Sequence, residues 1–295
     1  MTHETPQEKG KQLLHELEKQ EAWNTERCLK LIQEGADVNI QDNSGRTPLI
    51  WAAYKNETDI VRALLDNGAD INAPSKDGWT ALLHALSRNN IASAHILIEC
   101  GADPNLPDNA GYTALMRAGK RSHTETVCAL LDKGANINEQ NNDMGRTALI
   151  ETALYGSTEA TLALLERGAN VNIQDHQGWN ALMCATGDGD ADRIHALLKH
   201  GAEIDVQNKH GETALISALQ SRNLENAQAL IEAGANINLK NKDGHTAQDI
   251  ARQKGHDDFV EIHYKRYIQK VFADAAKKGT PHARKIRRRK IGAAP

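Results

Sequence analysis

The sequence is poor in aromatic residues: its 295 residues include two Phe, five Tyr and four Trp. Eleven large rings are too few for a compact globular core of this length. Small and aliphatic side chains must therefore do the packing. That kind of packing suits helices set close together. Hydrophobic residues still make up 40% of the chain and charged residues 25%, which excludes wholesale disorder.

Long apolar runs and paired cysteines are absent as well. No apolar run approaches the roughly eighteen residues that cross a bilayer, and the N-terminus has no apolar stretch typical of a secretory signal. The cysteines are scattered and form no Cys-x-x-Cys pair, so we expect free, mostly buried thiols in a reducing compartment. These features predict a cytoplasmic protein, with secretion as an effector without a cleaved signal as the alternative. The four cysteines are Cys28, Cys100, Cys128 and Cys184.

The net charge of −4 hides an uneven distribution of charge. Residues 265–295 carry eleven Lys and Arg against one acid, Asp274, whereas the rest of the chain holds 24 basic and 38 acidic residues. The sequence therefore joins an acidic body to a basic tail, two parts with opposite electrostatic behaviour.

A repeat of 33 or 34 residues runs through most of the chain. The dipeptide Gly-Ala recurs at Gly35, Gly68, Gly101, Gly134, Gly168, Gly201 and Gly234. A second glycine follows at Gly45, Gly78, Gly111, Gly145, Gly178, Gly211 and Gly244. The interval between the two is ten residues except in the fourth unit, where it is eleven. We expect the extra residue, within Asn138–Gly145, to lengthen a mobile turn that includes residues 141–144 rather than to interrupt a helix.

Each unit is predicted to form a turn, a helix, a loop and a second helix. A Thr two residues after the second glycine, or Asn180 in the fifth unit, can cap the first helix, and Pro48 or an Ala suits its first turn. The second helix has apolar residues at helical spacing and stops at the next Gly-Ala, where glycine suits the left-handed position. The first helix should break at residues most of which tolerate a positive φ, Ser122 and Arg222 being the poorer choices. These breaks are Asn56, Asn89, Ser122, Gly156, Gly189, Arg222 and Gly255.

The segment GADVNIQDNSGRTPLIWAA at Gly35–Ala53, with its six later copies, closely resembles the ankyrin repeat family. The resemblance covers roughly residues 8–264 and implies an all-α ankyrin-repeat solenoid with capping helices at both ends. The expected organisation is an N-terminal segment and capping helix pair (1–41), six repeats (42–240), a C-terminal capping repeat and helix (241–278), and a basic, disordered tail (279–295).

Motifs of catalysis and metal binding are weak throughout. Asp188–Asp192 resembles the start of a calcium loop, but Arg193 and Lys199 stand where that loop needs Gly and Glu. No nucleophile elbow, phosphate-binding loop or paired Cys/His spacing occurs. We therefore predict no catalytic residue, no metal and no cofactor.

A pattern associated with modification recurs with the repeat. The Asn of each Gly-Ala-x-x-Asn has a Leu eight residues upstream, a pattern that marks hydroxylation in animal ankyrin repeats. The fold itself requires the same Leu and Asn as core and turn residues, so we favour the structural interpretation. These residues are Asn39, Asn72, Asn105, Asn138, Asn172 and Asn238.

The position just after the second glycine is the most informative for function. The resemblance implies that it lies exposed at the tip of the turn and faces a concave surface together with parts of the first helix. The position holds Arg46, Trp79, Tyr112, Arg146, Trp179, Glu212 and His245. Trp, Tyr and Arg carry a disproportionate share of interface energy, although Trp packing on a neighbouring turn is the alternative. The predicted partner contacts are Arg46, Trp51, Tyr54, Trp79, Arg88, Tyr112, Arg117, Arg121, Arg146, Tyr155 and Trp179.

The resemblance implies a non-catalytic, monomeric module that binds a protein partner through its concave face, as a scaffold, an inhibitor or a bacterial effector. The rival function is binding of nucleic acid or an anionic membrane through the basic tail. A solvated solubility tail and docking on the acidic body are further alternatives, and base stacking is not expected because no aromatic accompanies the cluster. The tail cluster is Arg284, Lys285, Arg287, Arg288, Arg289 and Lys290.

Overall fold

The computed structural model describes residues 4–19, 23–187 and 190–277, which form sixteen α-helices, one 3₁₀ helix and no strand. The chain divides into two compact units, Met1–His176 and Gln177–Pro295. The predicted all-α repeat architecture is confirmed, and each unit is described separately below.

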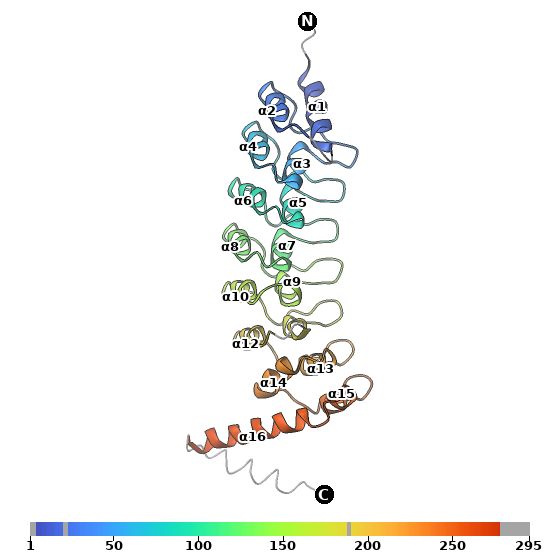
Figure 1. The fold of residues 1–295 in the computed structure, drawn as a ribbon, viewed down its shortest axis with the longest axis vertical. Helices are drawn as coiled ribbons and strands as arrows, with labels where there is room; N and C mark the ends of the chain where they lie inside the picture. Colours follow the sequence, from blue (N-terminus) through green and yellow to red (C-terminus); the bar gives the residue numbers. More distant parts are fainter. Residues whose placement is uncertain (1–3, 20–22, 188–189, 278–295) are drawn as a thin grey trace. The chain divides into compact units, whose positions relative to one another are not determined.

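The first unit stacks its helices in two rows (Figure 1). The helices are α1 (Pro6–Glu18), α2 (Thr25–Gln33), α3 (Pro48–Lys55), α4 (Thr58–Asp66), α5 (Ala81–Arg88), α6 (Ile91–Glu99), α7 (Ala114–Lys120), α8 (Thr124–Asp132), α9 (Ala148–Tyr155) and α10 (Thr158–Glu166). Each helix contacts its partner within the repeat and, inside this unit, its counterpart in a neighbouring repeat. We call α3, α5, α7 and α9 the inner row and α4, α6, α8 and α10 the outer row. The turns lie on the side of the inner row.

The second unit repeats the pattern with a shortened first helix. Its helices are α11 (Ala181–Cys184), the 3₁₀ helix η1 (Ala185–Gly187), α12 (Ala191–Lys199), α13 (Ala214–Gln220), α14 (Leu224–Glu232), α15 (Ala247–Gln253) and α16 (Phe259–Lys277). Helix α13 packs against α11 and α15, and α14 packs against α12 and α16. The helix expected at the end of the segment 241–278 is present as α16, which covers α14 and α15 at the end of this unit.

The helix starts follow the predicted capping chemistry. The Thr47 hydroxyl accepts the N–H of Ile50 at 3.2 Å, and Asn180 accepts the N–H of Met183 at 3.0 Å. Thr113 differs, because its side chain makes no capping hydrogen bond to α7 although the residue has the same extended backbone. The extended cap residue therefore recurs even where the side-chain bond is missing.

The helix breaks follow the prediction with one exception. Asn56, Asn89, Ser122, Arg222 and Gly255 all have positive φ, whereas Gly189 lies outside the described residues. Gly156 has φ −93°, so the prediction that it would take a left-handed conformation is wrong. A Cβ at Gly156 would lie 2.7 Å from the Thr152 carbonyl oxygen and 2.8 Å from that of Gly119. Glycine is needed there for space and not for handedness.

The turns of successive repeats are joined by backbone hydrogen bonds. The donor–acceptor pairs are Lys76–Ser44 (2.9 Å), Asn109–Asp77 (3.1 Å), Asn142–Ala110 (3.0 Å) and His176–Met144 (2.7 Å) in the first unit, and Lys209–Gln177 (2.9 Å) and Lys242–His210 (2.9 Å) in the second. The extra residue of the fourth repeat lies between α8 and α9, outside both helices, and the series continues through it. That part of the insertion prediction is confirmed.

All four cysteines lie in described segments and none forms a disulfide. Cys28 and Cys184 are buried, Cys128 is half-buried and Cys100 is exposed, so "mostly buried" is correct for only two of them. Burial raises the pKa of the Cys28 thiol to about 11. Among the described residues, every helix is too short or too polar to span a bilayer.

Candidate functional site

Ten of the eleven predicted contact residues belong to the first unit, where nine lie on the inner row or on the turns before it and Arg121 lies directly after α7. Trp179 belongs to the second unit, where it is half-buried just before α11. The predicted tail cluster from Arg284 to Lys290 lies outside the described residues.

The residues at the turn tips are half-buried, which corrects the expectation that this row is exposed. Trp79 shows why. Its ring lies 5.0 Å from the ring of His84 on α5, and the guanidinium of Arg117 lies over the same indole, 4.0 Å from the ring centroid. Tip side chains therefore fold back over the inner helices and contact the next repeat.

An aromatic and cationic cluster extends this packing toward the N-terminus. Tyr54 makes edge-on contacts with Trp51 and His84, with ring centroids 5.7 and 5.9 Å apart. Arg88 lies over Tyr54 at 4.1 Å and Arg46 over Trp51 at 4.9 Å, both within the range of a cation–π interaction. The cluster joins side chains from two repeats into one surface.

Arg117 is the best anchored cation of the inner row. It forms an ion pair with Asp108, whose side chain is only 4% exposed, and it lies over both Trp79 and Tyr112. The Asp108 carboxylate also accepts the backbone N–H groups of Ala110 and Tyr112 at 3.0 and 2.9 Å. Because the carboxylate is fixed by the turn, it fixes the guanidinium that stacks on the rings.

His84 stays neutral beneath this cluster. Burial lowers its pKa to about 4, and the positive charges of Arg46 and Arg117 act in the same direction. Its Nε2 atom has no hydrogen-bond partner among the described residues. The ring therefore acts as a packing element between Trp79 and Tyr54.

Helices α7 and α9 approach each other closely because two glycines lie between them. A Cβ at Gly119 would collide with the Thr152 hydroxyl, and a Cβ at Gly156 would collide with backbone oxygens. This approach places the Lys120 ammonium 4.6 Å from the centroid of the Tyr155 ring. Tyr155 is 52% exposed, so it offers a ring face at the end of α9.

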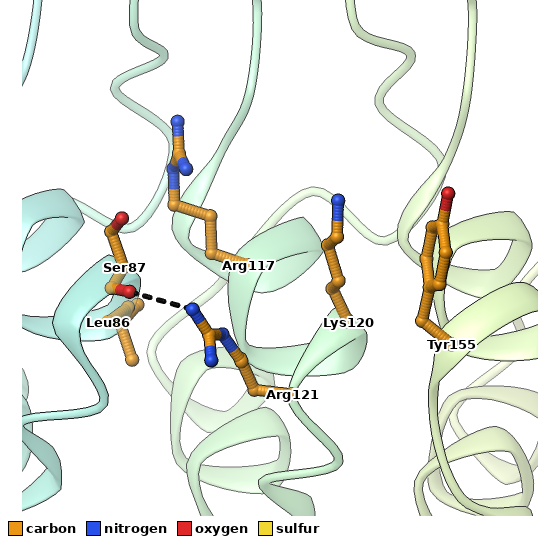
Figure 2. Close-up of a pocket in the computed structure, with 6 residues that line it drawn as sticks. All are labelled: Leu86, Ser87, Arg117, Lys120, Arg121 and Tyr155. Atoms are coloured by element: carbon orange, nitrogen blue, oxygen red, sulfur yellow. Dashed lines mark hydrogen bonds between the residues drawn. The ribbon is translucent and has the colours of Figure 1, made fainter.

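A pocket of about 340 Å³ opens at this place. Arg121 at the end of α7 donates a hydrogen bond to the Ser87 carbonyl oxygen at 3.0 Å, while Lys120 and Tyr155 project side by side from neighbouring helices (Figure 2). Three of the residues that line it are cationic and one is aromatic, so the pocket suits an anionic group next to an apolar one. The lining is Leu86, Ser87, Arg117, Lys120, Arg121 and Tyr155.

Comparison with known families decides what this repeating structure is. A family model described as ankyrin repeats, three copies, matches residues 20–108, 93–175, 153–241 and 182–270. The chain belongs to the ankyrin repeat family. A comparison with curated protein sequences returns no match. Ankyrin repeats are generally protein–protein interaction modules and are typically non-catalytic.

The acids on the inner face of these ankyrin repeats are buried beneath the cations. Glu151 is fully buried on α9, with carboxylate oxygens 3.5 Å from Arg146 and 3.9 Å from Lys120. Arg146 also lies 3.6 Å from the buried carboxylate of Asp175. Along the helices of the inner row, positive charge is therefore exposed while the acid, Glu151, is buried.

Sequence reasoning missed Lys120, Glu151 and Asp108 as members of this site. A usable signal existed, because Glu151 occupies the repeat position of Trp51 and Arg117, and all three are therefore expected on one face. Glu151 was overlooked because the binding surface was predicted from Trp, Tyr and Arg, and an acid does not fit that composition.

The described part of the ankyrin repeats contains no group of three His, Cys, Asp or Glu side chains that could hold a metal ion. In the segment that resembles a calcium loop, Asp190 accepts the N–H of Arg193 at the start of α12 and forms an ion pair with its guanidinium at 3.3 Å. That carboxylate has a structural role in capping α12.

Proposed function

We propose that the protein is a non-catalytic binding module whose first unit holds a protein partner on the inner face, the face that the family resemblance predicts to be concave. The observation that carries the proposal is the stacked cluster of Trp79, Tyr112 and Arg117 beside the exposed Tyr155. Arg, Trp and Tyr dominate binding energy at interfaces. Scaffolds, enzyme inhibitors and effectors all use a surface of this kind.

Preorganisation supports the proposal. Arg117 is held by a buried carboxylate and two rings, and Arg88 is held over Tyr54. Side chains that are ordered before binding lose little conformational entropy on contact with a partner, so more of the contact energy remains as affinity.

Photo-crosslinking in the native host tests the proposal directly. A photoreactive amino acid replaces Tyr155 on the inner row, and in a matched control it replaces Arg62, which is exposed on α4 of the outer row. We expect a discrete protein adduct at Tyr155 that is absent at Arg62. Adducts of the same proteins at both positions, or none at Tyr155, would contradict binding on the inner face.

Removal of residues 282–295 separates this function from the rival one. The adduct at Tyr155 should persist in the truncated chain at physiological salt, because the described contacts do not involve the tail. If truncation abolishes it, and if binding in the full chain falls steeply with ionic strength, the basic tail carries the interaction instead.

A further inference from the structure

The two rows of helices in the first unit carry opposite charge. The outer row contains seven acids, Asp59, Asp66, Glu99, Glu125, Asp132, Glu159 and Glu166, and a single Lys or Arg, which is Arg62. The inner row contains four such basic residues, Lys55, Arg88, Arg117 and Lys120, and a single acid, Glu151. An approaching partner therefore meets a positive face on one side of the repeats and a negative face on the other.

The cations of the inner row differ in whether they are already neutralised. Arg117 is paired with Asp108, whereas the nearest carboxylate oxygen to Lys120 is 3.9 Å away, on Glu151. Within the described residues, neither Arg88 nor Arg121 has a carboxylate partner. All three of Arg88, Lys120 and Arg121 are exposed, so positive charge is available around the pocket.

We propose that the pocket between α5, α7 and α9 is the docking site for a short acidic segment of the protein partner. Asp or Glu carboxylates of that segment bind Arg121 and Lys120, and an adjacent apolar side chain packs on the ring of Tyr155 (Figure 2). Arg88, on the same helix as the lining residues Leu86 and Ser87, extends the anionic contact by one repeat. The inference rests on the proposed function, because it names the chemistry of the partner on that face.

Charge density favours an acidic protein segment over a nucleic acid. Proteins that bind nucleic acid can neutralise about six to ten phosphates, whereas only two exposed cations, Lys120 and Arg121, line this pocket. The seven acids of the outer row also repel a long polyanion, but they affect a short segment confined to the inner row much less.

Pocket size also favours an extended segment over a second copy of this chain. The pocket of about 340 Å³ accepts one or two side chains. The acids of the outer row lie on regular helices, so they can reach the pocket of a second copy only together with the helix that carries them. A flexible segment can place a carboxylate between Arg121 and Lys120 without that restriction.

Fluorescence anisotropy with labelled peptides tests the proposal on the full chain. The probe is a fluorescein-labelled poly-glutamate peptide with one central Tyr, and a poly-glutamine peptide of the same length is its neutral control. The test variant is Arg121→Glu, with Lys120→Glu as a second variant, and Arg62→Glu introduces the same charge change on the outer row. All three positions are exposed, but Lys120→Glu also places a carboxylate near the buried Glu151, so circular dichroism verifies the fold of each variant and Arg121→Glu carries the test.

We expect the poly-glutamate peptide to bind and the poly-glutamine peptide not to bind. Affinity should fall by about tenfold in Arg121→Glu and in Lys120→Glu, since each reverses a charge in contact with a carboxylate, and it should change less than about twofold in Arg62→Glu. Equal losses in all three variants would show attraction by overall charge and overturn the site.

Two further measurements test whether a nucleic acid or a second copy of this chain occupies the pocket instead. Oligothymidylate that binds more tightly than poly-glutamate and depends on Arg121 would overturn the assignment in favour of a nucleic acid. Self-association of the unlabelled protein that Arg121→Glu abolishes, measured by light scattering, would overturn it in favour of a second copy. If the Tyr155 adduct forms but poly-glutamate does not bind, the acidic segment is wrong while partner binding on the inner face stands.

Discussion

The guanidinium carbon of Arg117 lies 4.0 Å from the centroid of the Trp79 ring, and these two residues belong to successive ankyrin repeats. The contact joins α7 to the turn before α5 in the preceding repeat, and the ion pair with Asp108 fixes it. Cation, ring and carboxylate form one unit that stabilises the interface between repeats as well as presenting a surface.

Replacement of Arg117 should therefore affect stability. Arg117→Met leaves the buried Asp108 carboxylate without its charge partner, and we expect a loss of about 2–4 kcal/mol in the free energy of unfolding. Arg117→Lys keeps the charge but loses the planar stack, and should cost less, about 1–2 kcal/mol. Urea denaturation followed by circular dichroism measures both. Equal, near-zero losses would mean that the ion pair contributes nothing.

Truncation of Trp79 to Ala should produce an intermediate effect. A fully buried ring would cost about 3–5 kcal/mol and a fully exposed one about half a kcal/mol, whereas Trp79 is half-buried against His84 and Arg117. We expect about 1–2 kcal/mol, with a further drop of about 2 kcal/mol in partner affinity. Melting curves and binding measurements on one preparation separate the two. A loss above about 3 kcal/mol with unchanged affinity would make Trp79 purely structural.

His84 should give the fold a defined pH dependence. Its pKa is about 4 in the folded chain against an ordinary value of 6.5, so between these values the unfolded chain binds more protons. Stability from this residue is complete above about pH 6.5 and is lost as the pH falls toward 4, by about 2–3 kcal/mol. The difference in unfolding free energy between wild type and His84→Gln, measured from pH 4 to 7, separates the contribution of His84 from that of the other titratable groups. A difference that does not vary with pH would contradict the assignment.

Glycines with positive φ and glycines that leave space for a neighbouring helix should respond differently to substitution. Gly134 has φ +83° and open space where a Cβ would lie, so Gly134→Val should cost about 1–3 kcal/mol through backbone strain and Gly134→Asn clearly less. Gly156 has an ordinary φ, yet Gly156→Ala should also cost about 1–3 kcal/mol because the methyl group meets two backbone oxygens. Thermal melts of the three variants check this. A Gly134→Val protein that melts like wild type would refute the left-handed turn.

The periodic features of the fold were predictable because each is fixed by local chemistry. Glycine, Thr and aliphatic residues at constant spacing specify turn, cap and helix within one repeat. The helix break at Ser122 was predicted from its register, although Ser is a poor choice for the positive φ that it adopts. Gly156 was mispredicted because its role depends on the distance between α7 and α9, a contact with residues more than thirty positions away. The sequence spacing within one repeat does not specify the distance between helices of different repeats.

The candidate site was predictable only in part, because local sequence spacing determines which face a residue lies on but not how deeply it is buried. Register placed Trp79, Tyr112 and Arg117 on one face, but their burial depends on how side chains from successive repeats lie across one another. The burial of Glu151 under Arg146 and Lys120 also arises between repeats. The sequence pattern within one repeat therefore predicts which residues share the inner face, but it does not predict which charged side chains on that face are exposed.

The hydrogen bonds that link one turn to the next have a consequence for how this protein can change. They join backbone atoms only, so the spacing of the tip positions does not depend on which side chains occupy them. The proposed binding surface can therefore be changed at one tip position at a time while the interval between the tips is kept. Natural variants and designed libraries that vary the positions of Arg46, Trp79 and Tyr112 would explore new partners at an unchanged tip spacing, whereas Arg146 is also needed beside the buried carboxylates of Glu151 and Asp175.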